Sequence, residues 1–183
     1  ASEAFDELLK GKNKKNAFVL GERGRAYLDQ GKTAEAAEYA QRAKDINSKC
    51  AVAYLLSGDI ALNLNDVNKA SSDYNQAIYL DEDCSEAYFK YAQVYKGVDP
   101  QLSLDMLMRL QSKTPEDNRI SKELADVYYT MGQYGKAKEA YENYLKVGTP
   151  TEQDYTRYAM LLYLNKDYAQ SLDMVKKGLE LAP

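Results

Sequence analysis

The sequence predicts an all-α fold, built as a solenoid of antiparallel helix pairs. The first observation is a repeat, because Gly24 recurs 34 residues later as Gly58 and Cys50 recurs 34 residues later as Cys84. The second is that apolar residues within each repeat recur at helical spacing, in two segments separated by a break. The third is that no segment alternates between apolar and polar residues as a strand would, so we expect no strands. A lone helix pair cannot bury its apolar face, so neighbouring pairs must stack.

Small residues recur at two positions of the repeat, one on each predicted helix. Small side chains at these positions allow two antiparallel helices to approach to about 8–10 Å. The first position holds Gly24, Gly58, Ala92, Ala125 and Ala159, and the second holds Ala36, Ala70, Ser103, Ala137 and Ser171. This frame predicts a single array over residues 1–183, in which an N-terminal helix and connector (1–16) precede repeats 17–50, 51–84, 85–117, 118–151 and 152–183.

Each repeat is predicted to contain two helices joined by a short turn. Gly31 and Gly132 are placed as residues that end the first helix, since glycine readily adopts the conformation found there. Asp99 followed by Pro100 predicts an N-cap and a first helical turn, in the one repeat that is a residue shorter. Residues 2–10 are expected to form one further helix.

Composition excludes several classes of function. The chain has 183 residues, 24 basic and 28 acidic side chains, a net charge of −4 and no histidine. It therefore has no histidine metal site, Ser-His-Asp triad or imidazole base, and we expect no catalytic residue, cofactor or metal. The acidic balance argues against nucleic-acid binding, and no apolar run approaches the 18 residues of a membrane span. The chain starts without a signal-peptide pattern, and we assign it no compartment.

Two local patterns are expected to be structural. Gly31-Lys32-Thr33 looks like the end of a phosphate-binding loop, but Ala26 stands where the first glycine is needed and no strand precedes it. Cys50 and Cys84 occupy the same position in adjacent repeats, which places them about 10 Å apart. A disulfide needs Cα atoms closer than about 7 Å, so we expect two free, half-buried thiols.

The repeat resembles the tetratricopeptide repeat (TPR) family over residues 17–183. The clearest unit is 118–151, with Leu124-Ala125-Asp126-Val127-Tyr128, then Met131-Gly132-Gln133-Tyr134, Ala137 and Tyr141. Arg23 departs from the pattern, because the family usually has an apolar residue there. The resemblance implies a right-handed superhelix in which the first helices line a concave groove. It also implies a non-catalytic scaffold that binds a partner protein or peptide.

The resemblance also indicates which side chains would line the groove, namely the first-helix residues not used in packing. These are Arg25, Leu28, Val52, Leu55, Leu56, Asp59, Leu62, Phe89, Lys90, Gln93, Arg119, Lys122, Asp126, Tyr129, Arg157, Met160 and Tyr163. The groove would be apolar around Leu55, Leu56 and Phe89, and an exposed apolar patch rimmed by charge suits a peptide. The alternative is that the leucines pack against a neighbouring helix.

The family's clamp for the terminal carboxylates of chaperone tails is not expected here. Whichever repeat the clamp starts from, an acidic residue falls among its positions: Glu86, Asp59 or Glu123. We therefore predict no tight binding of chaperone tail peptides. Two alternatives to the scaffold stay open. The array would be the targeting or assembly segment of a larger protein with an enzymatic or signalling domain, or it would self-associate through its uncapped ends as a structural protein.

Overall fold

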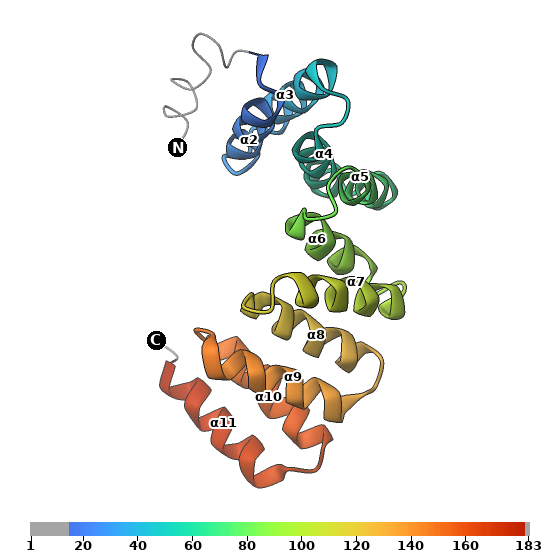
Figure 1. Cartoon of the computed structure of the whole chain (residues 1–183). Helices are drawn as coiled ribbons and strands as arrows, with labels where there is room; N and C mark the ends of the chain where they lie inside the picture. Colours follow the sequence, from blue (N-terminus) through green and yellow to red (C-terminus); the bar gives the residue numbers. More distant parts are fainter. Residues whose placement is uncertain (1–14, 182–183) are drawn as a thin grey trace. The chain divides into compact units, whose positions relative to one another are not determined.

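The computed structural model describes residues 15–181, which form ten α-helices and no strand (Figure 1). This confirms the predicted all-α fold. The helices are α2 (Ala17–Leu28), α3 (Thr33–Ile46), α4 (Ala51–Asn63), α5 (Val67–Leu80), α6 (Ser85–Tyr95), α7 (Pro100–Lys113), α8 (Asn118–Thr130), α9 (Tyr134–Val147), α10 (Glu152–Leu164) and α11 (Tyr168–Leu181). The helix expected over residues 2–10 lies outside the described residues.

The chain divides into two compact units, Ala1–Tyr91 and Ala92–Pro183, with the boundary inside α6. In the first unit, α2 packs on α3, α4 packs on α5, and α4 also contacts α2 and α3. In the second unit, α8 packs on α9 and α10 on α11, while α7 contacts α8 and α9 contacts α10. Each unit therefore buries its apolar residues between successive helices.

The two small-residue positions of the repeat meet where the helices of a pair approach most closely. In the first unit, a Cβ added at Gly24 would lie 3.0 Å from the Cβ of Tyr39 on α3, and would also clash with Leu56 of the next pair. A Cβ added at Gly58 would clash with the ring of Tyr74 on α5. In the second unit the serine hydroxyls bond across the contact, because Ser103 Oγ donates to the carbonyl of Ala92 and Ser171 Oγ to that of Ala159, both at 2.7 Å. Larger side chains would separate the helices and break these bonds.

Arg23 fits the apolar position it occupies because two tyrosines surround it. Its side chain is buried, and its Nε and Nη2 donate to the hydroxyls of Tyr39 and Tyr27 at 2.9 and 3.0 Å. The guanidinium carbon also lies 5.1 Å from the Tyr27 ring centre and 5.5 Å from that of Tyr39, within cation–π range. Burial would lower the pKa of Arg23, but the tyrosine contacts outweigh it and raise the pKa.

In four helix pairs, the turn between the two helices contains one residue in the left-handed conformation. Gly31 and Gly132 have φ of +75° and +70°, and Asn65 and Lys166 have φ of 59° and 67° at the equivalent positions. The sequence indicated the two glycines. Asparagine tolerates this conformation, whereas lysine is strained in it. Gly31 lies in the turn between α2 and α3, so Gly31-Lys32-Thr33 is not part of a phosphate-binding loop.

Replacing Lys166 with glycine should stabilise the second unit by about 1 kcal/mol, because the left-handed conformation costs an L-residue about 1–2 kcal/mol. Part of this gain is offset by the greater freedom of glycine in the unfolded chain. Urea unfolding followed by circular dichroism measures the change. Gly132→Ala is the matched control and should destabilise the same unit. A stability change of the same sign in both variants would contradict the assignment.

Both cysteines are free, as expected. Cys84 is half-buried as expected, whereas Cys50 is buried, because it packs with Ala17, Leu20 and Ala53 in a core cluster. Within residues 15–181, no group of acidic or cysteine side chains is arranged to hold a metal ion. Over the same residues, no helix combines the length and the apolar character needed to cross a membrane.

Candidate functional site

In the first unit, the apolar residues expected to line a groove belong to the core instead. Leu55, Leu56 and Phe89 are only 2%, 0% and 7% exposed. Leu56 packs in a cluster with Ala36, Ala40 and Ile60. The expectation of an apolar groove surface at these three residues is therefore wrong, and they hold the helices together.

The remaining candidates of the first unit are partly packed or paired. Asp59 accepts a hydrogen bond from the hydroxyl of Tyr74 at 2.7 Å and lies 3.4 Å from Lys90 Nζ. Burial and the Asp59 carboxylate raise the pKa of Tyr74, so its phenol stays protonated and donates. Arg25 Nη1 pairs with Glu22 at 3.2 Å. Val52 and Leu28 pack against core clusters, and Leu62 is half-buried.

In the second unit, a cavity of about 360 Å³ opens between α8 and α10. Its floor is apolar and consists of the buried residues Ala125, Tyr141 and Leu161. Its rim is accessible, since Tyr129 is 38% exposed and Met160 is 54% exposed. We call this surface the α8–α10 face, and it consists of Lys96, Ala125, Asp126, Tyr129, Thr130, Tyr141, Arg157, Met160 and Leu161.

The charged side chains of the α8–α10 face meet at Asp126. Arg157 Nη1 lies 3.1 Å from both carboxylate oxygens of Asp126, and Lys96 Nζ lies 3.1 Å from Oδ2. Lys96 also donates to Glu123 Oε2 at 2.8 Å, while Gln93 donates to Glu123 Oε1 at 2.8 Å. Burial would lower the pKa of Lys96, but the two carboxylates outweigh it and raise that pKa. Lys96 is therefore a fixed cation of the face.

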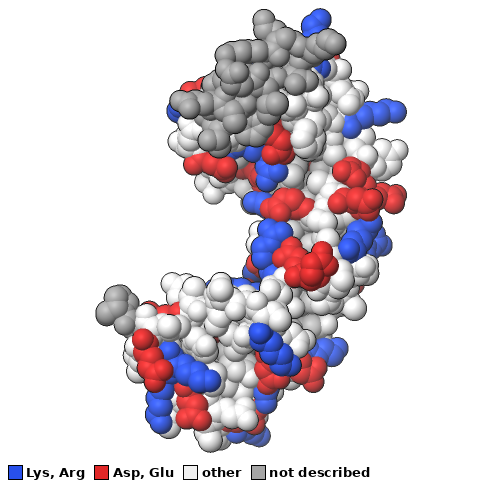
Figure 2. Space-filling model, turned by 60° about the vertical axis from the view of Figure 1, so that its left-hand side comes forward, with Lys and Arg blue, Asp and Glu red and all other residues white. Residues whose placement is uncertain are grey.

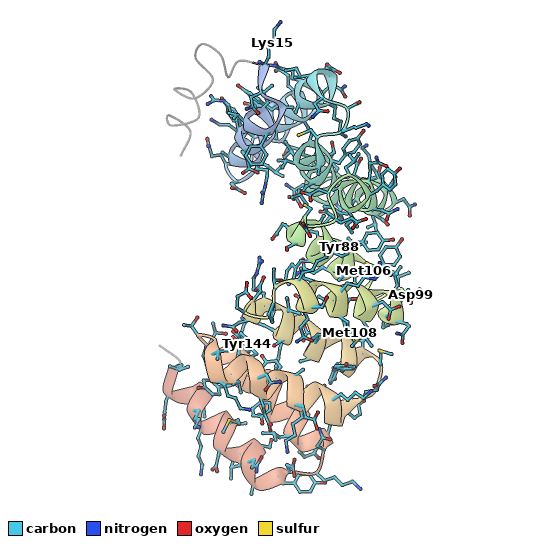
Figure 3. The ribbon with its side chains drawn as sticks, in the orientation of Figure 1. Lys15, Tyr88, Asp99, Met106, Met108 and Tyr144 are labelled. Atoms are coloured by element: carbon cyan, nitrogen blue, oxygen red, sulfur yellow. The ribbon has the colours of Figure 1, made fainter. Side chains whose placement is uncertain are left out.

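Tyr141 links the floor of the cavity to a buried carboxylate at the α9–α10 contact. Asp154 is 1% exposed and accepts hydrogen bonds from the hydroxyls of Tyr141 and Tyr144, each at 3.0 Å. Lys122 Nζ pairs with it, and the Thr151 backbone and hydroxyl donate to it in a capping box at the start of α10. Tyr144 is labelled on α9 in Figure 3.

The pKa of Asp154 reflects this surrounding. Burial alone would raise the pKa of the carboxyl, but the Lys122 ammonium and the hydrogen bonds from Thr151 and Tyr141 outweigh it and hold the pKa well below its ordinary value. Asp154 is therefore an anion that anchors α10 to α9. The repeat pattern does not predict this role, because the equivalent positions in three other repeats hold Ala53, Ala87 and Ile120.

Opposite charges are interspersed on the visible surface and do not gather by sign (Figure 2). Ion pairs of the second unit follow the same pattern, for example Lys138 with Asp167 at 2.6 Å. On the face that Figure 2 shows, the described residues form no extended basic patch of the kind that binds nucleic acid.

Family models for the tetratricopeptide repeat match residues 51–84, and residues 1–49 together with 122–183. The chain belongs to the tetratricopeptide repeat family. No curated protein sequence matches this TPR chain.

Solved structures show the same fold at low sequence identity. A crystal structure of MamA is 21% identical, with a TM-score of 0.75 over 86% of this chain and 92% of that chain. PilF of Pseudomonas aeruginosa is 22% identical, with a TM-score of 0.79 over 96% of this chain and 78% of that chain. YrrB, described as a TPR protein with an unusual peptide-binding site, is 16% identical, with a TM-score of 0.76 over 100% of this chain and 94% of that chain.

The structure brings together four of the residues that the TPR resemblance indicated in the second unit. Asp126, Tyr129, Arg157 and Met160 all line the α8–α10 face. The repeat pattern predicted that the floor residues Tyr141 and Ala125 pack between helices. Their positions in the repeat did not indicate that part of each side chain also lines a cavity. The other four candidates do not line the face. Gln93 bonds to Glu123, Lys122 pairs with Asp154, and Arg119 pairs with Asp117. Tyr163 is 62% exposed, and its ring contacts that of Tyr168.

The last described TPR helix, α11, presents an apolar stripe to solvent. Leu172, Val175 and Leu179 are 56%, 42% and 66% exposed. In the repeat frame, Val175 takes the position at which Tyr74 and Tyr141 are fully buried. Self-association through such a surface stays a prediction, which the dependence of molecular mass on concentration would test.

Proposed function

We propose that this TPR chain is a non-catalytic scaffold that binds a partner protein or peptide at the α8–α10 face. The TPR fold supports a protein–protein interaction scaffold in general. The choice of face rests on one observation, which is that exposed Tyr129, Met160 and Arg157 surround a cavity with a buried apolar floor. Tyrosine, methionine and arginine are the residue types enriched in protein interfaces.

The size and flexibility of the cavity suit a side chain of a partner. Its volume of about 360 Å³ lies near the lower end of ligand sites. Met160 is unbranched and can adapt its shape to an inserted group. The YrrB structure, which has the same fold, is described as having a peptide-binding site, and this favours a peptide segment as the occupant here.

The charges of the face favour binding over catalysis. Lys96 and Arg157 both pair with Asp126, and the carboxylates of Glu123 and Asp126 raise the pKa of Lys96 and hold it in its charged form. A general acid or base instead needs a pKa near the working pH. We therefore assign the face a binding role and no proton-transfer role.

The test is capture of partners from a lysate of the source cells with wild type and two matched variants. Met160→Glu places a charge at the cavity rim and should abolish capture of a specific partner. Met108→Glu is the control, because Met108 is 53% exposed on α7, a helix that contributes no residue to the face (Figure 3). Circular dichroism should show both variants folded.

A partner that is captured equally by wild type and both variants would place binding elsewhere on the chain and contradict the assignment. If neither variant captured the partner, the loss would reflect added negative charge anywhere on the surface, and binding at the α8–α10 face would not be supported.

A further inference from the structure

We propose that the α8–α10 face recognises an extended partner segment in which an apolar residue lies next to an internal aspartate or glutamate. The apolar side chain fills the cavity, and the neighbouring carboxylate binds Arg157. This inference rests on the proposed function, since it names the chemistry of the ligand for the same face.

The hydrogen-bonding groups of the face determine what a ligand must supply. Both oxygens of Asp126 already accept from Arg157, and one of them also accepts from Lys96. Both oxygens of Glu123 accept from Gln93 and Lys96. Arg157, in contrast, donates through Nη1 alone to the described residues. Its Nε and Nη2 remain as donors, so the group missing from the face is an acceptor.

The form of Arg157 favours a carboxylate as that acceptor. A guanidinium carries five N–H donors in a rigid plane and binds carboxylates through two parallel hydrogen bonds. Asp126 holds Nη1, which leaves the Nε–Nη2 edge for the ligand. The side chain of Arg157 is 58% exposed, so a partner can reach this edge without disturbing the pair with Asp126.

The pairing of charges around the cavity leaves Arg157 as the cation with the fewest anionic partners. The cations Lys96 and Arg157 are matched by Asp126 and by Glu123, which accepts from Lys96 at 2.8 Å, so these four groups carry no net charge. Lys96 contacts both carboxylates, whereas Arg157 contacts only Asp126 among the described residues. A lysine or arginine of a partner would meet both cations, and like charges placed together at an interface cost affinity.

The apolar half of the ligand follows from the floor. Ala125, Tyr141 and Leu161 are 1%, 0% and 4% exposed and present no hydrogen-bonding group that lacks a partner, since the Tyr141 hydroxyl already donates to Asp154. Tyr129 and Met160 form apolar walls above them. An aliphatic or aromatic side chain inserted here would bury its area against apolar atoms. The ligand thus needs both an apolar anchor and an adjacent acid.

The experiment selects ligands from a random peptide library, displayed between two linkers so that no peptide ends in a free carboxylate. Selection uses the full chain as wild type, Arg157→Glu, Met160→Glu and Arg109→Glu. The last variant is a charge-matched control, because Arg109 is an exposed residue of α7. One selected peptide is then synthesised with its acid intact, with the acid changed to lysine, and with an amidated C-terminus, and titrated against each protein.

The expected result is a set of peptides with an aspartate or glutamate within two residues of a shared apolar residue. Arg157→Glu should lower the affinity for the synthesised peptide by about tenfold or more, since it replaces attraction between opposite charges by repulsion between like charges. The lysine form of the peptide should recover binding to Arg157→Glu. Arg109→Glu should leave the affinity within about twofold, as expected for a remote surface charge.

Peptides that depend on Met160 but lack an acid, or whose affinity is unchanged in Arg157→Glu, would overturn this inference and leave the proposed function standing. Loss of affinity on amidation would also overturn it, because the carboxylate would then be terminal. Selection of no peptide that Met160→Glu weakens would reject the α8–α10 face itself, and the proposed function with it.

Discussion

Replacing Asp154 with alanine should destabilise the second unit by about 1.5–3 kcal/mol, the cost of removing a buried charged group that accepts several hydrogen bonds. The substitution leaves the Lys122 ammonium without its anion, and it leaves the hydroxyls of Tyr141 and Tyr144 without their acceptor. It also removes the capping box of α10, which stabilises a helix by about 1 kcal/mol. Urea unfolding and amide hydrogen exchange of α9 and α10 measure the loss.

The matched control is Asp173→Ala. Asp173 is 66% exposed and lies 4.0 Å from Lys176, and such surface pairs contribute about 0–1 kcal/mol. A loss in Asp154→Ala no greater than in Asp173→Ala would contradict the anchoring role of the buried carboxylate.

The stabilisation by Asp154 should depend on pH in a defined direction. The folded-state pKa of Asp154 lies below its ordinary value of 3.8, so the folded protein binds this proton less readily than the unfolded chain. The contribution is therefore complete above about pH 4 and is lost as the pH falls toward the folded-state pKa. The stability difference between wild type and Asp154→Asn should stay constant from neutral pH to about pH 5 and shrink below pH 4. A difference that grows on acidification would contradict this assignment.

Replacing Leu56 with alanine should destabilise the first unit by about 2–5 kcal/mol, because the side chain is fully buried and its removal leaves a cavity. The cluster with Ala36, Ala40 and Ile60 lies between α3 and α4, so hydrogen exchange should accelerate in both helices. Leu64→Ala is the control, since Leu64 is 67% exposed and should change stability by less than about 0.5 kcal/mol.

The Leu56→Ala variant also distinguishes the two roles that the sequence left open for this residue, in the groove or in the core. If Leu56 lined an accessible groove, its removal would lower stability by less than about 1 kcal/mol and affect only binding. A loss of several kcal/mol places it in the core, as the structure does.

The helix pairs were predictable because their spacing depends on residues that the sequence marks clearly. The clash that a Cβ would make at Gly24 or Gly58 depends only on the close approach of two helices. In two other repeats, the hydroxyls of Ser103 and Ser171 donate hydrogen bonds across the contact between the paired helices. Local pattern and packing therefore give the same answer at these positions.

The site was only partly predictable, because the sequence does not show how much of each helix is covered. Helix α4 packs against α2, α3 and α5, so Leu55 and Leu56 are both buried on it. In the second unit, Asp126 and Met160, which the same reasoning indicated, both line the cavity. Periodicity identifies the apolar side of a helix. The number of helices packed against it determines how many of its residues are buried.

The buried carboxylate of Asp154 limits how the repeats of this chain can be rearranged. In the first repeat, the positions equivalent to Tyr141 and Tyr144 hold Ala40 and Ala43. An engineered chain that joined the fifth repeat directly to the first would therefore bury an aspartate against two methyl groups, without the two tyrosine hydroxyls and the lysine that satisfy it here. The fourth and fifth repeats form a cassette that has to be shuffled, duplicated or grafted as one piece.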